Sequence, residues 1–405
     1  MNRFPKLRFF ILLAALPAVV ASEEPNPRPS NDPTSPLMLA GPEIPADTHK
    51  IDFERLPRSK SEHVIVSDVR APGSSPQKPD KSAGGVNQHN YLTHHGKQFW
   101  IMWSDGPGVE DRVGQRVNYA TSRDGLHWSA PKELTGHPPG SGPGSPYFGT
   151  RSDQGRRYIA RGFWERDGEL LALVALDEAA GFFGPGLELR AFRFDPNSDS
   201  WIDAGLVAKN AINNFPPRKI RTGEWMMSRR RHDYKTTGVD FLTGGVKAID
   251  DWRSFPVLES AAELKAEEPE WWELPDGSLS AVFRDNARSG YLFRSFSTDD
   301  GRTWSKPVRT NFPDATSKVC GLRLSDGRYV LVSNSNPKRR DPLTIAVSDD
   351  GLVFSKLFYL AGGRHVDYPH VIEHEGSLLI AFSGGKQSVE VLRIRISDLF
   401  DPHTK

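Results

Sequence analysis

This sequence has few of the features that by themselves indicate a class of protein, such as paired cysteines or a strong net charge. Its 405 residues include one cysteine, Cys320, so the chain cannot form an internal disulfide or a cysteine-based metal site. The formal net charge is +1, which gives no overall basic field for nucleic acid. The twelve histidines show no metal-ligand spacing. We therefore expect no cofactor, no metal and no nucleic-acid partner.

Long apolar runs are also scarce, and the longest lies at the N-terminus. Arg3, Lys6 and Arg8 precede this run, and Val19 and Ala21 supply small residues for cleavage. The pattern predicts a signal peptide over residues 1–21 and a secreted or periplasmic protein, with an uncleaved anchor as the alternative. We expect no stable membrane insertion. The sequence does not indicate an oligomeric state.

The domain organisation follows from composition. Residues 22–47 are rich in proline, serine and asparagine, which predicts a disordered linker. Residues 48–405 have almost no helical periodicity. They contain short apolar or alternating runs such as KQFWIMWS and SLLIAFSG, bounded by glycine, proline, aspartate or asparagine. This pattern is typical of an all-β domain with many short strands.

One turn sequence occurs three times, as SRDGLHW (122–128), STDDGRTW (297–304) and SDDGLVF (348–354). Its serine and aspartate can hydrogen-bond backbone N–H groups, its glycine permits positive φ, and its aromatic residue packs on the sheet. Ser297 and Ser348 are 51 residues apart, which suits one four-stranded propeller blade. We predict a six-bladed β-propeller, with seven blades as the alternative. A two-sheet sandwich would not explain the repeat.

The turn resembles the Asp box of the sialidase superfamily of β-propellers, and only residues 297–304 match it fully. The stretch EPEWWELPDGSLSAVFRDNARSGYLFRSFSTDDGRTWSKP is similar to the sialidase segment that runs from an active-site glutamate to an active-site arginine, which fall on Glu268 and Arg284. SNSNPKRRDPLTIAVSDDG resembles the segment with a further active-site arginine, here Arg340. VDYPHVIEHEGSLLIAF resembles the stretch with the nucleophilic tyrosine, here Tyr368, although Pro369 replaces the usual small polar residue.

This resemblance implies an exo-glycosidase that acts on sialic acid or a related acidic sugar. Planar arginine side chains bind a sugar carboxylate in bidentate fashion, which is the role implied for Arg284 and Arg340. A neutral tyrosine avoids repulsion by that carboxylate, but its pKa near 10 requires a base. The resemblance implies Tyr368 as nucleophile with Glu268 as its base. The expected partner is an acidic oligo- or polysaccharide.

The first blade departs from the sialidase pattern. Sialidases have an Arg-Ile-Pro motif there, whereas this chain has Gln88, His89 and Asn90 and no arginine between Arg70 and Arg112. His89 can act as a general acid or base. This favours an alternative in which His89 and Tyr368 serve a lyase, or a histidine-dependent glycosidase, that acts on rhamnose- and uronate-containing glycans. A non-catalytic glycan-binding propeller is the third hypothesis.

Further candidate site residues are indicated by their position in the chain. Spacing from the first Asp box places the general acid at Glu110 or Asp111, and Gln88 and Asn90 are candidate substrate contacts. Trp271 precedes Trp272, and successive strand residues face opposite sides, so we expect one in the core and Trp271 beneath the sugar. The basic cluster Arg229–Arg231 with His232 is a further candidate surface for an acidic glycan.

Overall fold

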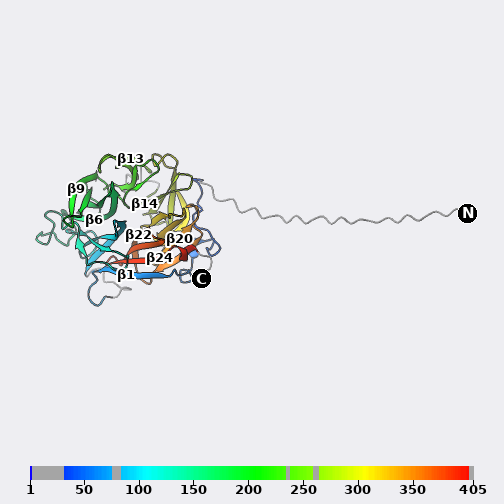
Figure 1. Cartoon of the computed structure of the whole chain (residues 1–405), viewed down its shortest axis with the longest axis horizontal. Helices are drawn as coiled ribbons and strands as arrows, with labels where there is room; N and C mark the ends of the chain where they lie inside the picture. Colours follow the sequence, from blue (N-terminus) through cyan, green and yellow to red (C-terminus); the bar gives the residue numbers. More distant parts are fainter. Residues whose placement is uncertain (2–31, 75–83, 234–237, 259–263, 401–405) are drawn as a thin grey trace.

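The fold is a ring of six β-sheets. The computed structural model describes Met1 and residues 32–74, 84–233, 238–258 and 264–400, which form six four-stranded antiparallel sheets. Figure 1 looks onto the ring, with β6, β14 and β22 near its middle and β1, β9 and β13 at its rim. This confirms the six-bladed β-propeller. Apart from Met1, the predicted signal peptide lies outside the described residues.

The strand bounds of the six blades are as follows. Blade 1 consists of β2 (Gly85–His95), β3 (Gln98–Pro107), β4 (Arg116–Ser122) and β5 (Lys132–Glu133), and blade 2 of β6 (Ser152–Arg166), β7 (Glu169–Ala179), β8 (Glu188–Asp195) and β9 (Ser200–Lys209). Blade 3 consists of β10 (Arg218–Lys219), β11 (Trp225–Arg230), β12 (Val239–Gly244) and β13 (Trp252–Pro256), and blade 4 of β14 (Ala266–Glu273), β15 (Leu279–Asp285), β16 (Tyr291–Ser297) and β17 (Val308–Pro313). Blade 5 consists of β18 (Cys320–Arg323), β19 (Tyr329–Ser333), β20 (Leu343–Ser348) and β21 (Lys356–Ala361), and blade 6 of β22 (Val366–His374), β23 (Ser377–Gly384), β24 (Ser388–Arg395) and β1 (Ser61–Asp68).

The ring is closed by strand β1. This strand comes from the N-terminal part of the domain and pairs antiparallel with β24, with Ser61 opposite Ile394. The first strands of blades 1, 2, 4, 5 and 6 lie innermost, since β2 contacts β6 and β22, and β18 contacts β14 and β22. The helical elements of the described residues are η1 (Thr48–Lys50) and α2 (Ser397–Phe400), and no described helix has the length and apolar character needed to cross a membrane.

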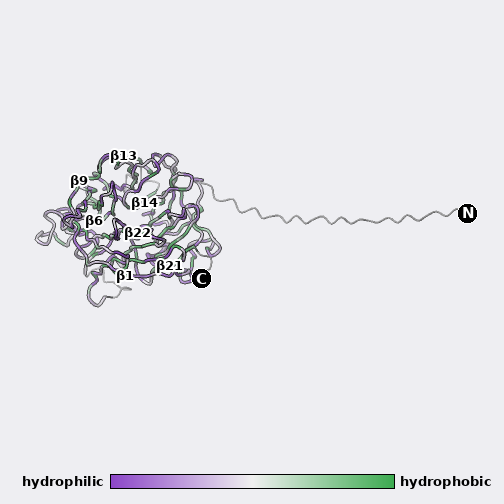
Figure 2. Tube along the Cα trace, in the orientation of Figure 1, coloured by the Kyte–Doolittle hydropathy of each residue, from purple (hydrophilic) through white to green (hydrophobic). Residues whose placement is uncertain are grey.

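The core lies between neighbouring blades. Because each blade packs on both faces, its middle strands are buried on both sides and read as nearly continuous apolar runs. Between blades 6 and 1, for example, Ile101 and Trp103 of β3 belong to the same buried cluster as Leu379 and Ala381 of β23. Figure 2 shows the resulting hydrophobic stretches along the strands, as between β22 and β21.

The three Asp boxes close turns between the third and fourth strands of blades 1, 4 and 5. In the full box, Ser297 Oγ donates to Asp299 Oδ1 at 2.9 Å and accepts from Gly301 N–H at 2.9 Å. The N–H of Thr303 donates to Asp299 at 2.8 Å, and the indole N–H of Trp304 donates to the Gly301 carbonyl at 3.0 Å. The side chains are thus occupied in holding the turn, as the sequence predicts.

The predicted linker differs from the structure in its described part, residues 32–47. Met38 and Leu39 are almost fully buried and pack with Phe312 and Phe354 between blades 4 and 5. Their N–H groups both donate to Asn311 Oδ1, at 2.8 and 2.9 Å. Two apolar side chains and two backbone donors therefore anchor a segment whose composition otherwise indicates disorder.

The buried side chain of His370 on β22 makes the stability of the ring sensitive to pH. Its Nδ1 accepts the N–H of Leu92 at 3.0 Å, and its ring stacks on Phe215. Burial, together with the positive charges of Lys318 and Arg218, lowers its pKa well below 6.5. The unfolded chain therefore binds this proton more readily than the folded chain as the pH falls below 6.5.

We predict that the free energy of unfolding falls as the pH is lowered from 6.5 to 5, by up to about 2 kcal/mol for His370 alone. Asparagine offers an uncharged acceptor for the Leu92 N–H, so His370→Asn should flatten this dependence. Urea unfolding of both proteins at several pH values measures the difference. Parallel curves for the two proteins would contradict the role of His370.

Candidate active site

Three inner strands share an irregularity at the same end of the ring. The register of β2 shifts between Gln88 and Tyr91, that of β14 between Glu267 and Glu270, and that of β22 between Asp367 and His370. A residue with left-handed backbone lies within each bulge: His89 (φ 56°), Glu268 (φ 46°) and Tyr368 (φ 57°). Such φ values are uncommon for residues other than glycine and cost of order 1 kcal/mol each. The bulges redirect three chemically active side chains toward one place.

That place is a cavity of about 390 Å³ at the end of the ring where the inner strands begin. Its anionic side chains are Glu110, Asp111, Glu267 and Glu268, and its cationic side chains are Arg151, Arg157, Arg161, Arg230, Arg284, Arg340 and Lys386. The lining therefore has more positive than negative groups. Such a cavity favours an anionic ligand.

The structure brings together seven of the residues predicted from the sequence, since the cavity is lined by His89, Glu110, Asp111, Glu268, Arg284, Arg340 and Tyr368. Three others are not part of its lining. Gln88 and Asn90 are fully buried at the bulge of β2. Trp271 is buried in the core between blades 3 and 4, where Arg218 lies 4.5 Å from its ring centroid. Trp271 and Trp272 are thus both core residues, because β14 is covered on both faces.

The hydroxyl of Tyr368 donates to Glu110 Oε1 at 3.1 Å. Burial alone would raise the pKa of Glu110, but the adjacent Lys386 and the nearby Arg157 lower it to about 2, so this carboxylate is ionised at neutral pH. Burial and the charge of Glu110 raise the pKa of the Tyr368 phenol above its usual value. The tyrosine therefore holds its proton beside an ionised acceptor.

Glu268, the base expected from the resemblance, is paired differently. Arg284 donates to Glu268 at 2.6 Å and to Glu267 at 2.5 Å, and Arg230 lies 3.8 and 3.5 Å from the same two carboxylates. Burial opposes the ionisation of Glu268, but Arg284 and Arg230 lower its pKa to about 2. In this structure the carboxylate that accepts the hydrogen bond of Tyr368 is Glu110.

Arg340 extends from the loop before β20 into the cavity. It donates to Asp367 at 3.0 Å and to the Thr316 carbonyl at 2.7 Å. Burial alone would lower its pKa, but Asp367 and Tyr368 raise it above the usual value. Arg340 therefore stays charged beside Tyr368.

His89 contacts the same pair of side chains. Its ring centroid lies 4.5 Å from that of Tyr368, and its Nε2 lies 3.7 Å from Glu110 Oε1. Burial and the positive charges of Arg161 and Lys318 lower the pKa of His89 well below 6.5. The imidazole is therefore neutral at neutral pH.

The structure also separates the two candidate acids of the first loop. Asp111 is paired with Arg157 and lies 3.5 Å from Arg151, so Glu110 is the one that faces Tyr368. Arg230 of the predicted basic cluster lines the cavity, whereas Arg229 and Arg231 are paired with Asp240.

Sequence analysis did not single out Lys386, Arg157 or Arg161, because none of them lies in a segment that resembles a known active-site motif. A weak signal for Arg157 and Arg161 is the presence of several arginines in RRYIARGFW, a run that is otherwise apolar.

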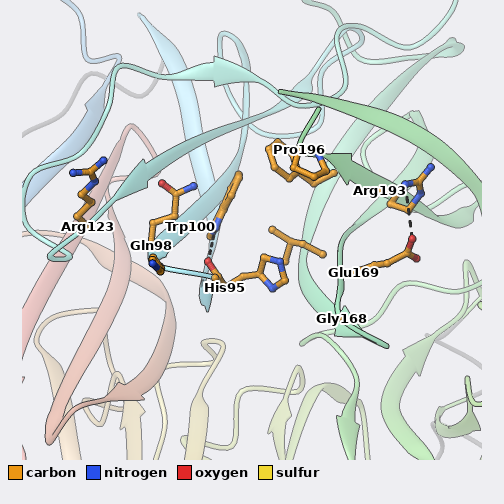
Figure 3. Close-up of a pocket in the computed structure, with 12 residues that line it drawn as sticks. His95, Gln98, Trp100, Arg123, Gly168, Glu169, Arg193 and Pro196 are labelled. Carbon is orange, nitrogen blue, oxygen red and sulfur yellow. Dashed lines mark hydrogen bonds and ion pairs between the residues drawn. The ribbon is translucent and has the colours of Figure 1, made fainter. Parts of the chain in front are cut away.

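A larger hollow of about 540 Å³ lies at the opposite end of blades 1 and 2 (Figure 3). Turns after β2, β6 and β8 form it, and it includes His95, Trp100 and Arg193. Trp100 Nε1 donates to the His95 carbonyl at 3.4 Å, and Arg193 lies 3.8 Å from Glu169. The hollow lacks a tyrosine–carboxylate pair and a cluster of buried charges, so the smaller cavity is the candidate site. No described group of three or more histidine, cysteine or acidic residues is placed to bind a metal.

Comparison with known proteins supports the fold. Residues 216–380 match the family model of the BNR repeat-like domain. A solved structure named sialidase is 20% identical with a TM-score of 0.58, and the match covers 89% of this chain and 35% of that one, so the chain spans about a third of its length. A comparison with curated proteins found no match. The chain therefore has the fold of the sialidase-like β-propellers.

Two further structures are similar over most of this chain. A protein of unknown function from Dyadobacter fermentans is 16% identical with a TM-score of 0.61, over 84% of this chain and 99% of that one. A leech intramolecular trans-sialidase, in complex with 2,7-anhydro-Neu5Ac, is 14% identical with a TM-score of 0.59, over 77% of this chain and 68% of that one. At these identities the likeness establishes the fold and leaves the activity to be tested.

The Lys386–Glu110 pair gives a prediction about stability. We expect Lys386→Met to lower the free energy of unfolding at pH 7 by about 2 kcal/mol, because it leaves the carboxylate of Glu110 without its cation in a partly buried site. Adding Glu110→Gln should restore most of this loss, since the unpaired charge is then removed. Urea unfolding of the two single variants and the double variant measures the coupling. Losses that simply add would contradict the pairing.

Proposed function

We propose that this chain is a glycosidase that removes an acidic sugar, sialic acid or a related sugar acid, from the end of a glycan. The observation that best supports this function is the Tyr368 hydroxyl on the ionised Glu110 within a cavity that has an excess of cationic groups. A cavity of about 390 Å³ lies at the lower end of the range for ligand sites and suits a sugar residue better than a long chain segment. The sialidase-like fold is consistent with this class of reaction.

In the proposed reaction the oxygen of Tyr368 attacks the anomeric carbon of the bound sugar. The bond from this oxygen to the anomeric carbon forms, the glycosidic carbon–oxygen bond breaks, and the phenolic proton passes to Glu110. The departing oxygen takes a proton from solvent. Water then attacks the anomeric carbon, the bond to the tyrosine oxygen breaks, and the phenol regains its proton from Glu110, while the proton that the water loses returns to solvent. Arg340, beside Tyr368, holds the carboxylate of the sugar.

The assignment of the base differs from the one that the resemblance implies. Glu268 would have to leave Arg284 and Arg230 before it could accept the proton of Tyr368. Glu110 already accepts that hydrogen bond. We therefore assign the role of proton acceptor to Glu110. The role of Glu268 is to hold Arg284 and Arg230 in position.

Replacement of the tyrosine hydroxyl tests the mechanism. Tyr368→Phe should lower kcat by about 10³-fold on the acidic glycoside that the wild type cleaves, because it removes the nucleophilic oxygen and leaves the ring in place. Release of reducing ends from sialosides, rhamnosyl-glucuronates and ulvan fragments measures activity, and thermal unfolding confirms that the variant folds. Turnover equal to that of the wild type would refute a tyrosine mechanism.

A second function is favoured by the contact of His89 with Tyr368. A neutral imidazole next to a tyrosine is also suited to β-elimination, in which His89 removes a proton from the sugar ring. The arginines of the cavity would bind the carboxylate of a uronate in this reaction. The product of a lyase contains an unsaturated uronate, which absorbs in the ultraviolet. We expect new reducing ends without new ultraviolet absorbance, and growth of that absorbance would identify a lyase.

A further inference from the structure

Six of the seven cationic side chains of the cavity have a carboxylate of the protein within ion-pair distance. The pairs are Arg151 and Arg157 with Asp111, Arg230 and Arg284 with Glu267 and Glu268, Arg340 with Asp367, and Lys386 with Glu110. Arg161 is the exception. In the described part of the chain no carboxylate is paired with it.

Arg161 nevertheless lies where the other residues of the site lie. It lies on β6 between Ala160 and Gly162, where the register of blade 2 shifts, as at the bulges of β2, β14 and β22. Its side chain lines the cavity although the residue is only 2% exposed. Burial lowers its pKa, although the side-chain hydrogen bond with Tyr91 and the charge of Glu268 oppose that shift.

A second buried cation, Lys318, shows how an interior charge is satisfied when it has no ligand to bind. Its Nζ donates to the Tyr91 hydroxyl and to the Asn214 carbonyl, both at 3.0 Å, and lies 3.9 Å from the ring centroid of Phe215. Lys318 does not line the cavity. Arg161 also interacts with Tyr91, but it differs from Lys318 because it is one of the residues that line the cavity.

A buried charge with no carboxylate within ion-pair distance is costly, and here Tyr91 and the more distant Glu268 offset only part of the desolvation. An anionic ligand would repay it on binding. Arg161 is also the charge with the largest influence on the pKa of His89, so it acts close to the bulge where blade 1 has His89 in place of an arginine. Arg161 of blade 2 and His89, which stands where blade 1 lacks an arginine, thus line the same cavity.

We propose that Arg161 binds the carboxylate of the substrate and, together with Arg340, replaces the arginine that the first blade lacks. Arg284 is less available for this role, because Glu267, Glu268 and Asn286 accept from its two terminal nitrogens. The identity of the ligand as a sugar acid rests on the proposed function. The presence of an anion site at Arg161 rests on its place in the cavity lining and on the lack of a carboxylate within ion-pair distance among the described residues.

The test measures anion binding and stability without relying on turnover. Binding of D-glucuronate and of N-acetylneuraminate to the full chain is followed by calorimetry at low ionic strength, for the wild type and for Arg161→Met, which keeps much of the side-chain length without the charge. Binding of the sugar acid should weaken at least tenfold. The melting temperature without ligand should rise, because the variant no longer buries an unpaired cation.

Arg156→Met is the matched control, because Arg156 lies on the same strand, is partly buried and does not line the cavity. Its affinity for the sugar acid should stay within twofold of the wild type. Arg161→Lys keeps the charge but lacks the planar fork, and should also weaken binding if the contact is bidentate. This second variant keeps the test valid should Arg161→Met fail to fold.

Unchanged affinity in both Arg161 variants would overturn the inference, whatever their stability. Inorganic sulfate separates this failure from a failure of the proposed function. If the wild type binds neither sugar acid, but sulfate raises its melting temperature saturably and Arg161→Met abolishes that effect, the anion site is supported and the sugar-acid function is refuted. If neither sugar acid nor sulfate binds to the wild type, the anion site itself is refuted.

Discussion

Positive charge buried at the centre of the propeller is the constraint on which the rest of the site depends. Arg161 and Lys318 have no carboxylate within ion-pair distance among the described residues, and their charges add to the effect of burial in lowering the pKa of His89. The other cavity cations keep Glu110 and Glu268 ionised with pKa values of about 2, despite their burial. The same positive charge therefore favours the neutral form of the histidine and the ionised form of both carboxylates. It also favours the binding of an anion.

The cavity also concentrates backbone strain. Of the twelve described residues other than glycine with positive φ, five line the cavity: His89, Asp111, Glu268, Tyr368 and Lys386. Each of these backbone conformations lowers the free energy of unfolding relative to an ordinary strand or turn. Inner strands with bulges, supported on both sides by neighbouring blades, can tolerate that cost, because the pairing around each bulge is complete. The ring is thus a rigid frame that holds a few strained side chains in place.

Local sequence signals predicted the fold and about half of the site. The Asp-box spacing indicated the blades, and the segments around Glu268, Arg284, Arg340 and Tyr368 placed four side chains in one cavity. The partner of Tyr368 was not predictable in this way, because Glu110 lies 258 positions earlier and reaches it only through closure of the ring. The same holds for Arg161, whose importance depends on which carboxylates are absent around it. Trp271 was misplaced because alternation along a strand cannot show that a blade is covered on both faces.

The central claim is that the cavity recognises the negative charge of a sugar acid. The most direct measurement compares the dissociation constant of the free acid with that of its methyl ester, which has nearly the same shape and no charge, at two salt concentrations. Binding of the acid should be at least tenfold tighter, about 1.4 kcal/mol, and should weaken with salt, whereas binding of the ester should change little. Equal affinities for acid and ester at both salt concentrations would contradict the account.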